Sequence, residues 1–170
     1  MSSPRNKGWT SLLNVSGHFS GAERPLERLL LDPKGGRGKE PEGTEDDTTE
    51  DVISAAIRFN DQINNQDLDK LTELMSEDHR SVDMGGKVVE GREEMSKGWA
   101  QFFEWFPDYR NIFSCVEARG NLVIMIGRSE CSYEPLHGPA VWTTKIGEGF
   151  VTEWRVYRDT EETRKILGIN

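Results

Sequence analysis

Residues 140–158, AVWTTKIGEGFVTEWRVYR, contain the pattern that decides the fold class. Two runs rich in β-branched and aromatic residues, 140–146 and 150–158, flank the triplet Gly147-Glu148-Gly149. Such runs favour strands, and the glycines between them favour a tight turn. The stretch therefore predicts an antiparallel hairpin.

Two further strand patterns come before this hairpin, at residues 109–118 and 122–133. Turn-forming residues separate them at Arg119-Gly120-Asn121 and again at residues 134–139. Because short connections favour pairing between neighbouring strands, we expect a sequential antiparallel meander of four strands.

Helical periodicity dominates the part of the domain before residue 109. Val52, Ala56, Phe59 and Ile63 recur at helical spacing after a capping pair, Thr48 and Asp51, and predict a helix that ends near Asn64-Asn65. A second short helix is expected from its cap Asp67 to about Glu77-Asp78, with Leu68, Leu71 and Met75 on one face. A hairpin should follow, with residues 79–84 and 87–89 around Gly85-Gly86.

A third helix is predicted between Gly91 and Pro107, with Met95, Trp99, Phe102 and Phe106 on one apolar face. Three helices followed by a strand meander are typical of an α+β fold. A strongly curved sheet wrapped on the third helix would form a cone with a cavity between them.

Composition excludes several classes of function. The 170-residue chain has 21 Lys and Arg against 30 Asp and Glu, a formal net charge of −9, so broad binding to nucleic acid or to an anionic membrane is not expected. No apolar run approaches the roughly 20 residues of a membrane span. Two cysteines, Cys115 and Cys131, favour a reduced setting, and we expect a cytoplasmic protein. Three scattered histidines and the lack of a Gly-rich phosphate loop predict no metal and no cofactor.

The chain divides near residue 48. Residues 1–47 are poor in apolar side chains and rich in Gly, Pro and acidic residues toward their end, which predicts a disordered extension and acidic linker. Leu26, Leu29 and Leu30 could form either a short docking helix or a transient one. Residues 48–170 form the predicted folded domain.

The order of these elements resembles a known superfamily. The motifs are Ser81-Val-Asp-Met-Gly-Gly86, Glu90-Gly-Arg-Glu-Glu94, Pro107-Asp-Tyr109 and the final strand within residues 149–159. Together they resemble the nuclear-transport-factor-two-like superfamily, and within it the SnoaL-like branch, which resembles polyketide cyclases, ketosteroid isomerases and limonene epoxide hydrolases. The resemblance covers about residues 50–165. It implies a cystatin-like α+β roll with a central apolar pocket, and a homodimer formed through the sheet.

Asp83 is the candidate catalytic residue. It falls where the ketosteroid isomerases keep their general base, and strand alternation places His79, Ser81 and Asp83 on one face. The alternative for Asp83 is a cap on the Gly85-Gly86 turn. The alternative for His79 is a residue that satisfies the last carbonyls of the second helix.

The resemblance also limits the activity. The oxyanion-binding tyrosine and aspartate of the isomerases correspond to Phe59 and approximately Trp142, of which only the Trp142 indole can donate a hydrogen bond. Arg128 and Glu130 are similar to the Arg-x-Asp strand of the epoxide hydrolases, but the remaining aspartate of those enzymes corresponds to Val156. Arg128 and Glu130 could instead form a surface ion pair.

The remaining candidates are aromatic and basic. Arg158 shares a strand face with Trp154 and Val156, so it either meets an anionic ligand group or is exposed at the cavity mouth. Aromatic side chains are expected in the core or in the pocket wall. The full set of candidate ligand-binding residues is Phe59, His79, Ser81, Trp99, Phe102, Arg128, Glu130, Trp142, Trp154 and Arg158.

Two functions follow from the sequence. One is the binding of a small, mostly apolar molecule in the cone cavity, with cofactor-independent acid-base catalysis of the isomerase, cyclase or hydrolase type through Asp83. The alternative is a non-catalytic module for dimerisation or ligand sensing. The sequence does not decide whether the protein is an enzyme.

Overall fold

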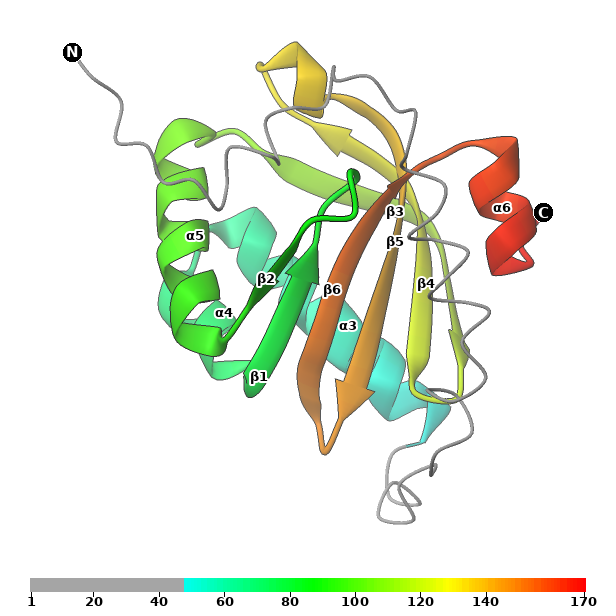
Figure 1. Ribbon diagram of the computed structural model, residues 1–170, viewed down its shortest axis with the longest axis horizontal. Coiled ribbons are helices and arrows are strands. Elements are labelled where there is room, and N and C mark those ends of the chain that lie inside the picture. The colour runs from blue at the N-terminus through cyan, green and yellow to red at the C-terminus, as the bar shows by residue number, and fades with distance from the viewer. Residues whose placement is uncertain (1–47) are drawn as a thin grey trace.

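The computed structural model describes residues 48–170 (Figure 1). The predicted extension over residues 1–47 lies outside the described residues, as does the predicted docking helix. The elements, in chain order, are α3 (Thr49–Asn65), α4 (Leu68–Glu73), β1 (Met75–Val82), β2 (Val88–Glu90), α5 (Arg92–Trp105), β3 (Arg110–Arg119), β4 (Leu122–Glu130), the 3-10 turn η2 (Glu134–Leu136), β5 (Gly138–Gly147), β6 (Phe150–Arg158) and α6 (Glu161–Leu167). No helix within residues 48–170 is both long and apolar enough to cross a membrane.

The first and third predicted helices are confirmed as α3 and α5. The Thr48 hydroxyl accepts from the Asp51 N–H at 3.2 Å, and the Asp51 carboxylate accepts from the Thr48 N–H at 3.1 Å, which completes a capping box. α5 begins directly after Gly91 and ends before Pro107. The apolar face of each helix is buried, as the periodicity predicted.

The second helix is shorter than predicted. α4 ends at Glu73, and Met75 already belongs to β1, which continues through His79 to Val82. The Val151 N–H donates to the Leu74 carbonyl at 2.9 Å, and Met75 is in register with Val151. Pairing with β6 therefore extends the strand into a segment whose local apolar spacing favours a helix.

The four-stranded meander is confirmed, and it lies within a six-stranded sheet of order β2-β1-β6-β5-β4-β3. All neighbouring strands are antiparallel except β1 and β6, which are parallel and which bring Ser81 beside Trp154. The sheet is therefore mixed, because β1 lies parallel to β6 at this one junction. Sequential antiparallel pairing alone does not predict this position of β1. The parallel junction brings the end of β1 and the turn after it to the end of β6.

A β-bulge bends the outer strands. The register between β3 and β4 shifts between Phe113 and Cys115, next to Gly127. A Cβ atom at Gly127 would lie 2.8 Å from the Phe113 Cα and closer still to the Ile112 carbonyl oxygen. Only glycine allows the two backbones to approach this closely.

The core lies between the helices α3, α4 and α5 and the concave face of the sheet. Its buried members include Phe59, Ile63, Met95, Met125 and Trp142. Figure 1 shows α3 behind the sheet and α5 at its edge, beside β2. Between α5 and the sheet the core gives way to a cavity.

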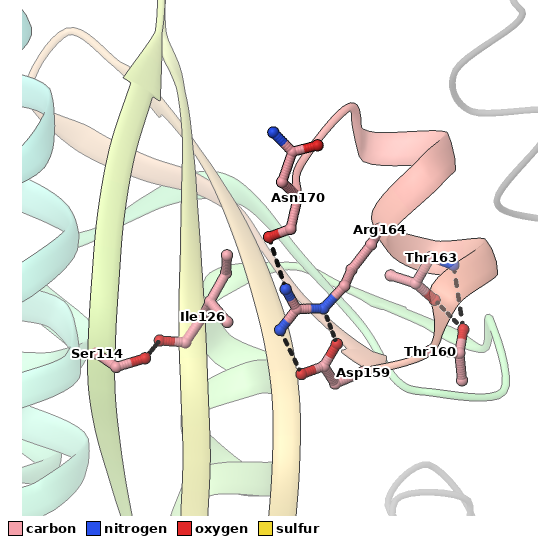
Figure 2. A network of polar contacts seen from close by, with 7 residues as sticks. All are labelled: Ser114, Ile126, Asp159, Thr160, Thr163, Arg164 and Asn170. Carbon is pink, nitrogen blue, oxygen red and sulfur yellow. Dashed lines mark hydrogen bonds and ion pairs between the residues drawn. The ribbon is translucent and has the colours of Figure 1, made fainter.

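The last helix, α6, was not predicted. It packs on the other face of the sheet, where Leu167 and Ile169 cover Ile124, Val141 and Tyr157. Arg164 donates to both oxygens of Asp159, at 2.6 and 2.9 Å, and to the Asn170 carbonyl at 2.7 Å (Figure 2). The hydrogen bonds from Arg164 to the carboxylate, with the positive charge of Arg164, lower the pKa of the Asp159 carboxyl. The ion pair ties α6 to the end of β6.

Candidate functional site

A cavity of about 220 Å³ lies between α5 and the concave face of the sheet. Its wall is made by the end of β1, by β4, β5 and β6, and by the loop that connects β4 to β5. Most of its lining side chains are apolar. The lining residues are Ser81, Met84, Trp99, Phe102, Tyr109, Ser129, Pro135, Leu136, His137, Gly138, Pro139, Trp142, Trp154, Val156 and Arg158.

Aromatic side chains from three elements form the body of this cavity. Trp99 and Phe102 come from α5, three residues apart on its buried face, and their rings meet edge to face at 5.4 Å. Trp142 from β5 and Trp154 from β6 face them from the sheet. Phe102 also contacts the ring of Tyr109 edge to face at 4.8 Å. Edge-to-face contacts are a favoured geometry of aromatic pairs, so these rings support one another in the wall.

Three side chains of strand β6 line the cavity, and their exposure increases along the strand. Trp154, Val156 and Arg158 alternate along the strand, so all three face the cavity. Trp154 is buried, Val156 is half-buried, and Arg158 is exposed. Arg158 therefore lines the cavity and is exposed, whereas its contact with an anionic ligand group stays a prediction.

Six of the eleven predicted site residues line the cavity. They are Ser81, Trp99, Phe102, Trp142, Trp154 and Arg158. The other five do not belong to the lining.

Phe59 and His79 lie in the core. Both are fully buried, and the Phe59 ring contacts His79 at 5.7 Å and Trp154 at 4.9 Å. His79 is in the middle of β1, not at a helix end, so the helix-capping alternative is wrong. Because a carbonyl only accepts, Nδ1 must carry the proton that is shared with the Val151 oxygen at 2.7 Å. Burial lowers the pKa of His79 to about 4.

Asp83 lies just beyond β1, in the turn before Lys87. Its Oδ1 accepts from the Gly85 N–H at 2.8 Å and from the Lys87 N–H at 2.9 Å. This is the turn cap that the sequence offered as an alternative. Its Oδ2 is buried and has no hydrogen-bond partner among the described residues, although the neighbouring Ser81 and Met84 line the cavity.

Arg128 and Glu130 lie on the other face of the sheet. Ser129, between them on β4, faces the cavity, so strand alternation turns both charged side chains away from it. The Arg128 guanidinium donates to the Glu130 carboxylate at 2.8 and 3.2 Å, and both side chains are exposed. Their arrangement is the surface ion pair that was the alternative interpretation.

The sequence analysis missed the loop wall of the cavity. Residues 134–139 were interpreted only as a connection, but five of them, from Pro135 to Pro139, line the cavity. The Ser129 hydroxyl donates to the Leu136 carbonyl at 2.6 Å and holds this loop against β4. The two prolines and Leu136 give the loop an apolar character, which was the available signal.

Tyr109 and Met84 were also missed. Burial raises the pKa of the Tyr109 phenol above its usual range. Tyr109 begins the segment that enters β3, and its contact with Phe102 is not visible in the strand pattern. Among residues 48–170 no cluster of His, Cys, Asp and Glu has the arrangement of a metal site.

Comparison with known proteins identifies the family to which this domain is similar. The pattern of the SnoaL-like domain matches residues 56–161. A sequence comparison with curated proteins gives no significant match.

Solved structures have the same fold at low sequence identity. An LEH-like epoxide hydrolase from M. tuberculosis is 19% identical, with a TM-score of 0.59 over 70% of this chain and 90% of that one. A protein from Sinorhizobium meliloti that is assigned to the polyketide cyclases is 14% identical, with a TM-score of 0.56 over 61% and 93%. A cystatin-fold protein from Novosphingobium aromaticivorans is 22% identical, with a TM-score of 0.56 over 63% and 97%.

These likenesses extend to the fold and not to a particular reaction. The family pattern covers most of the described domain, and the α+β architecture, with helices packed on one face of a curved sheet, is the one that the resemblance implied. The protein therefore belongs to the family of SnoaL-like domain proteins.

Proposed function

We propose that the domain binds a small, mostly apolar molecule in the cavity between α5 and the sheet. The observation that carries this proposal is the wall itself: Trp99, Phe102, Trp142 and Trp154 line a space that the described side chains leave unfilled, next to a core of buried apolar side chains. Protein interiors are normally filled, so an apolar void of this size loses contacts that a ligand would restore.

The size of the cavity limits the ligand. Its volume of about 220 Å³ is below the range of roughly 300–1,000 Å³ that is typical of sites for drug-sized molecules. A molecule with one or two rings, or a branched chain of similar bulk, fits this space. Its affinity would come mainly from apolar surface removed from water, at about 25 cal/mol per Å².

Filling the cavity tests this proposal. Val156 is half-buried in the wall, and Val156→Phe would place a ring where the ligand is expected. Val88→Phe is the matched control, because Val88 is exposed on β2 and lies outside the cavity. The probe is the neutral fluorophore N-phenyl-1-naphthylamine, titrated into the full chain.

We expect the wild type and V88F to bind the probe with equal affinity, and V156F to bind it at least tenfold more weakly. Thermal unfolding of each variant checks that the fold is retained. Equal binding by folded V156F, or no binding by the wild type, would count against a ligand in this cavity.

A second candidate is acid-base catalysis by Asp83. The observation that favours it is the buried Oδ2, which accepts no hydrogen bond from the described residues, beside two residues that line the cavity. A carboxylate in this position could take a proton from a carbon next to a ligand carbonyl and return it elsewhere on the same molecule. Weighing against it, Asp83 itself is outside the lining and is held in the turn.

Asp83→Asn separates a catalytic role of the Asp83 carboxylate from its role as a cap on the turn. The amide Oδ1 can still accept from Gly85 and Lys87, whereas the proton acceptor is lost. If Asp83 is the acid-base group, D83N should lower the isomerisation of 3-cyclohexen-1-one by orders of magnitude and leave probe affinity unchanged. Equal turnover by wild type and D83N, or no turnover by either, would favour the non-catalytic binding or sensing module.

A further inference from the structure

The mouth of the cavity differs in charge from the rest of the protein. The chain has a formal net charge of −9. Of the described residues that line the cavity, none is Asp or Glu, and Arg158 is the one Lys or Arg. A fixed cation therefore stands at the entrance of an apolar cavity in an acidic protein.

Arg158 is placed by the strand that also forms the cavity wall. Trp154, Val156 and Arg158 face the same side of β6, and four residues of strand correspond to roughly 13 Å. The antiparallel partner of Arg158 is Ala140, which fixes this end of β6 beside the loop wall. The guanidinium thus lies at one end of the cavity and the buried indole of Trp154 lies toward the other.

The other polar residues that line the cavity, besides Arg158, are uncharged or exposed. His137 lines the cavity from the loop and is exposed, and its ring can donate a hydrogen bond to a polar ligand group. Ser81 is buried, 8% exposed, lines the cavity and lies beside Trp154 in the parallel register. A ligand therefore meets the donors Arg158 and His137 on the exposed part of the lining and aromatic faces along its body. The hydroxyl-bearing residues Ser81, Tyr109 and Ser129 line the rest of the cavity.

We propose that the ligand is a small monocarboxylate whose apolar body lies among the tryptophans and whose carboxylate meets Arg158 at the mouth. This proposal rests on the proposed ligand-binding function and names its substrate class. The planar guanidinium matches a carboxylate with two parallel hydrogen bonds. A cationic ligand would meet Arg158 with the same charge and no carboxylate in the wall, so the lining disfavours it.

Two probes of the same shape test the carboxylate. 4-Phenylbutyrate and its neutral amide, 4-phenylbutanamide, are titrated by calorimetry into the full chain of the wild type, Arg158→Gln and Arg110→Gln. Arg110 is the matched control, because it is exposed on β3 and does not line the cavity. Quenching of tryptophan fluorescence gives an independent readout, since Trp99, Trp142 and Trp154 line the site.

We expect the wild type and R110Q to bind the carboxylate about ten- to hundredfold more tightly than the amide, as hydrogen bonds to a charged group allow. R158Q should lose this preference while its affinity for the amide stays unchanged. Raising the salt concentration should weaken carboxylate binding more than amide binding.

Three outcomes would overturn the proposal: equal affinity of the wild type for both probes, a carboxylate preference that survives in R158Q, or no binding of either probe. Amide binding without a carboxylate preference would leave the proposed ligand-binding function intact. Failure of that function itself is decided separately, by the neutral fluorophore and V156F.

Discussion

His79 makes the stability of the domain depend on pH. Burial lowers its pKa from the ordinary 6.5 to about 4, because the folded protein disfavours the charged ring. The unfolded chain therefore binds a proton between these two pH values that the folded chain does not bind. The free energy of unfolding should fall as the pH drops from about 6.5 to about 4, and this contribution should be constant below that.

The size of the effect follows from the shift. One pKa unit corresponds to about 1.4 kcal/mol, so the loss for this single group approaches about 3 kcal/mol. His79→Asn can keep a donor to the Val151 carbonyl but has no titrating ring. Urea unfolding at pH 7 and at pH 4.5 should show a smaller loss for H79N than for the wild type. Parallel losses in the two proteins would assign the pH dependence to other groups.

Single residues also show why part of the site could be predicted. Strand alternation identified Trp154 and Arg158 on one face, because a residue's side on a strand depends only on its position along it. The same rule places Arg128 and Glu130 together, but it does not say which face of the sheet they occupy. That choice depends on the fold, and Ser129 takes the inward position.

At the scale of elements, the sequence predicted those that local patterns specify. α3 and α5 follow from their buried stripes and from the cap at Thr48, and β6 has the predicted bounds. α4 ended early because backbone pairing between Leu74 and Val151, 77 residues apart, competes with its helical pattern. Such a contact leaves no periodic signal in either segment.

Two elements were missed for a related reason. α6 contributes only Leu167 and the nearby Ile169 to the apolar cluster on the sheet, too few to give a helical period. Its position depends on the Arg164 ion pair with Asp159 (Figure 2). The wall formed by the loop between β4 and β5 depends on the bond from Ser129 to Leu136. These restraints join residues only five and seven positions apart, but they depend on single polar side chains and so leave no periodic apolar signal.

At the scale of the whole molecule, α6 limits how two copies can associate. The resemblance implies a homodimer through the sheet, but α6 already covers Ile124, Val141 and Tyr157 on the outer face. A dimer of ordinary stability buries about 800 Å² on each partner, so it needs outer surface that α6 leaves open. The outer positions of β3, where Ile112 pairs with Arg128, are not among the residues that α6 covers.

We therefore expect a homodimer whose contact includes Ile112. Ile112→Glu would place a charge of the same sign on each partner within the expected contact and should convert the full chain to a monomer at micromolar concentration, as measured by sedimentation velocity. Ile57→Glu is the matched control, because Ile57 is exposed on α3 and lies away from the sheet's outer face. A wild-type chain that sediments only as a monomer would contradict the dimer. A dimer that persists in I112E would show that the contact lies on another surface, because a glutamate at position 112 would then face solvent.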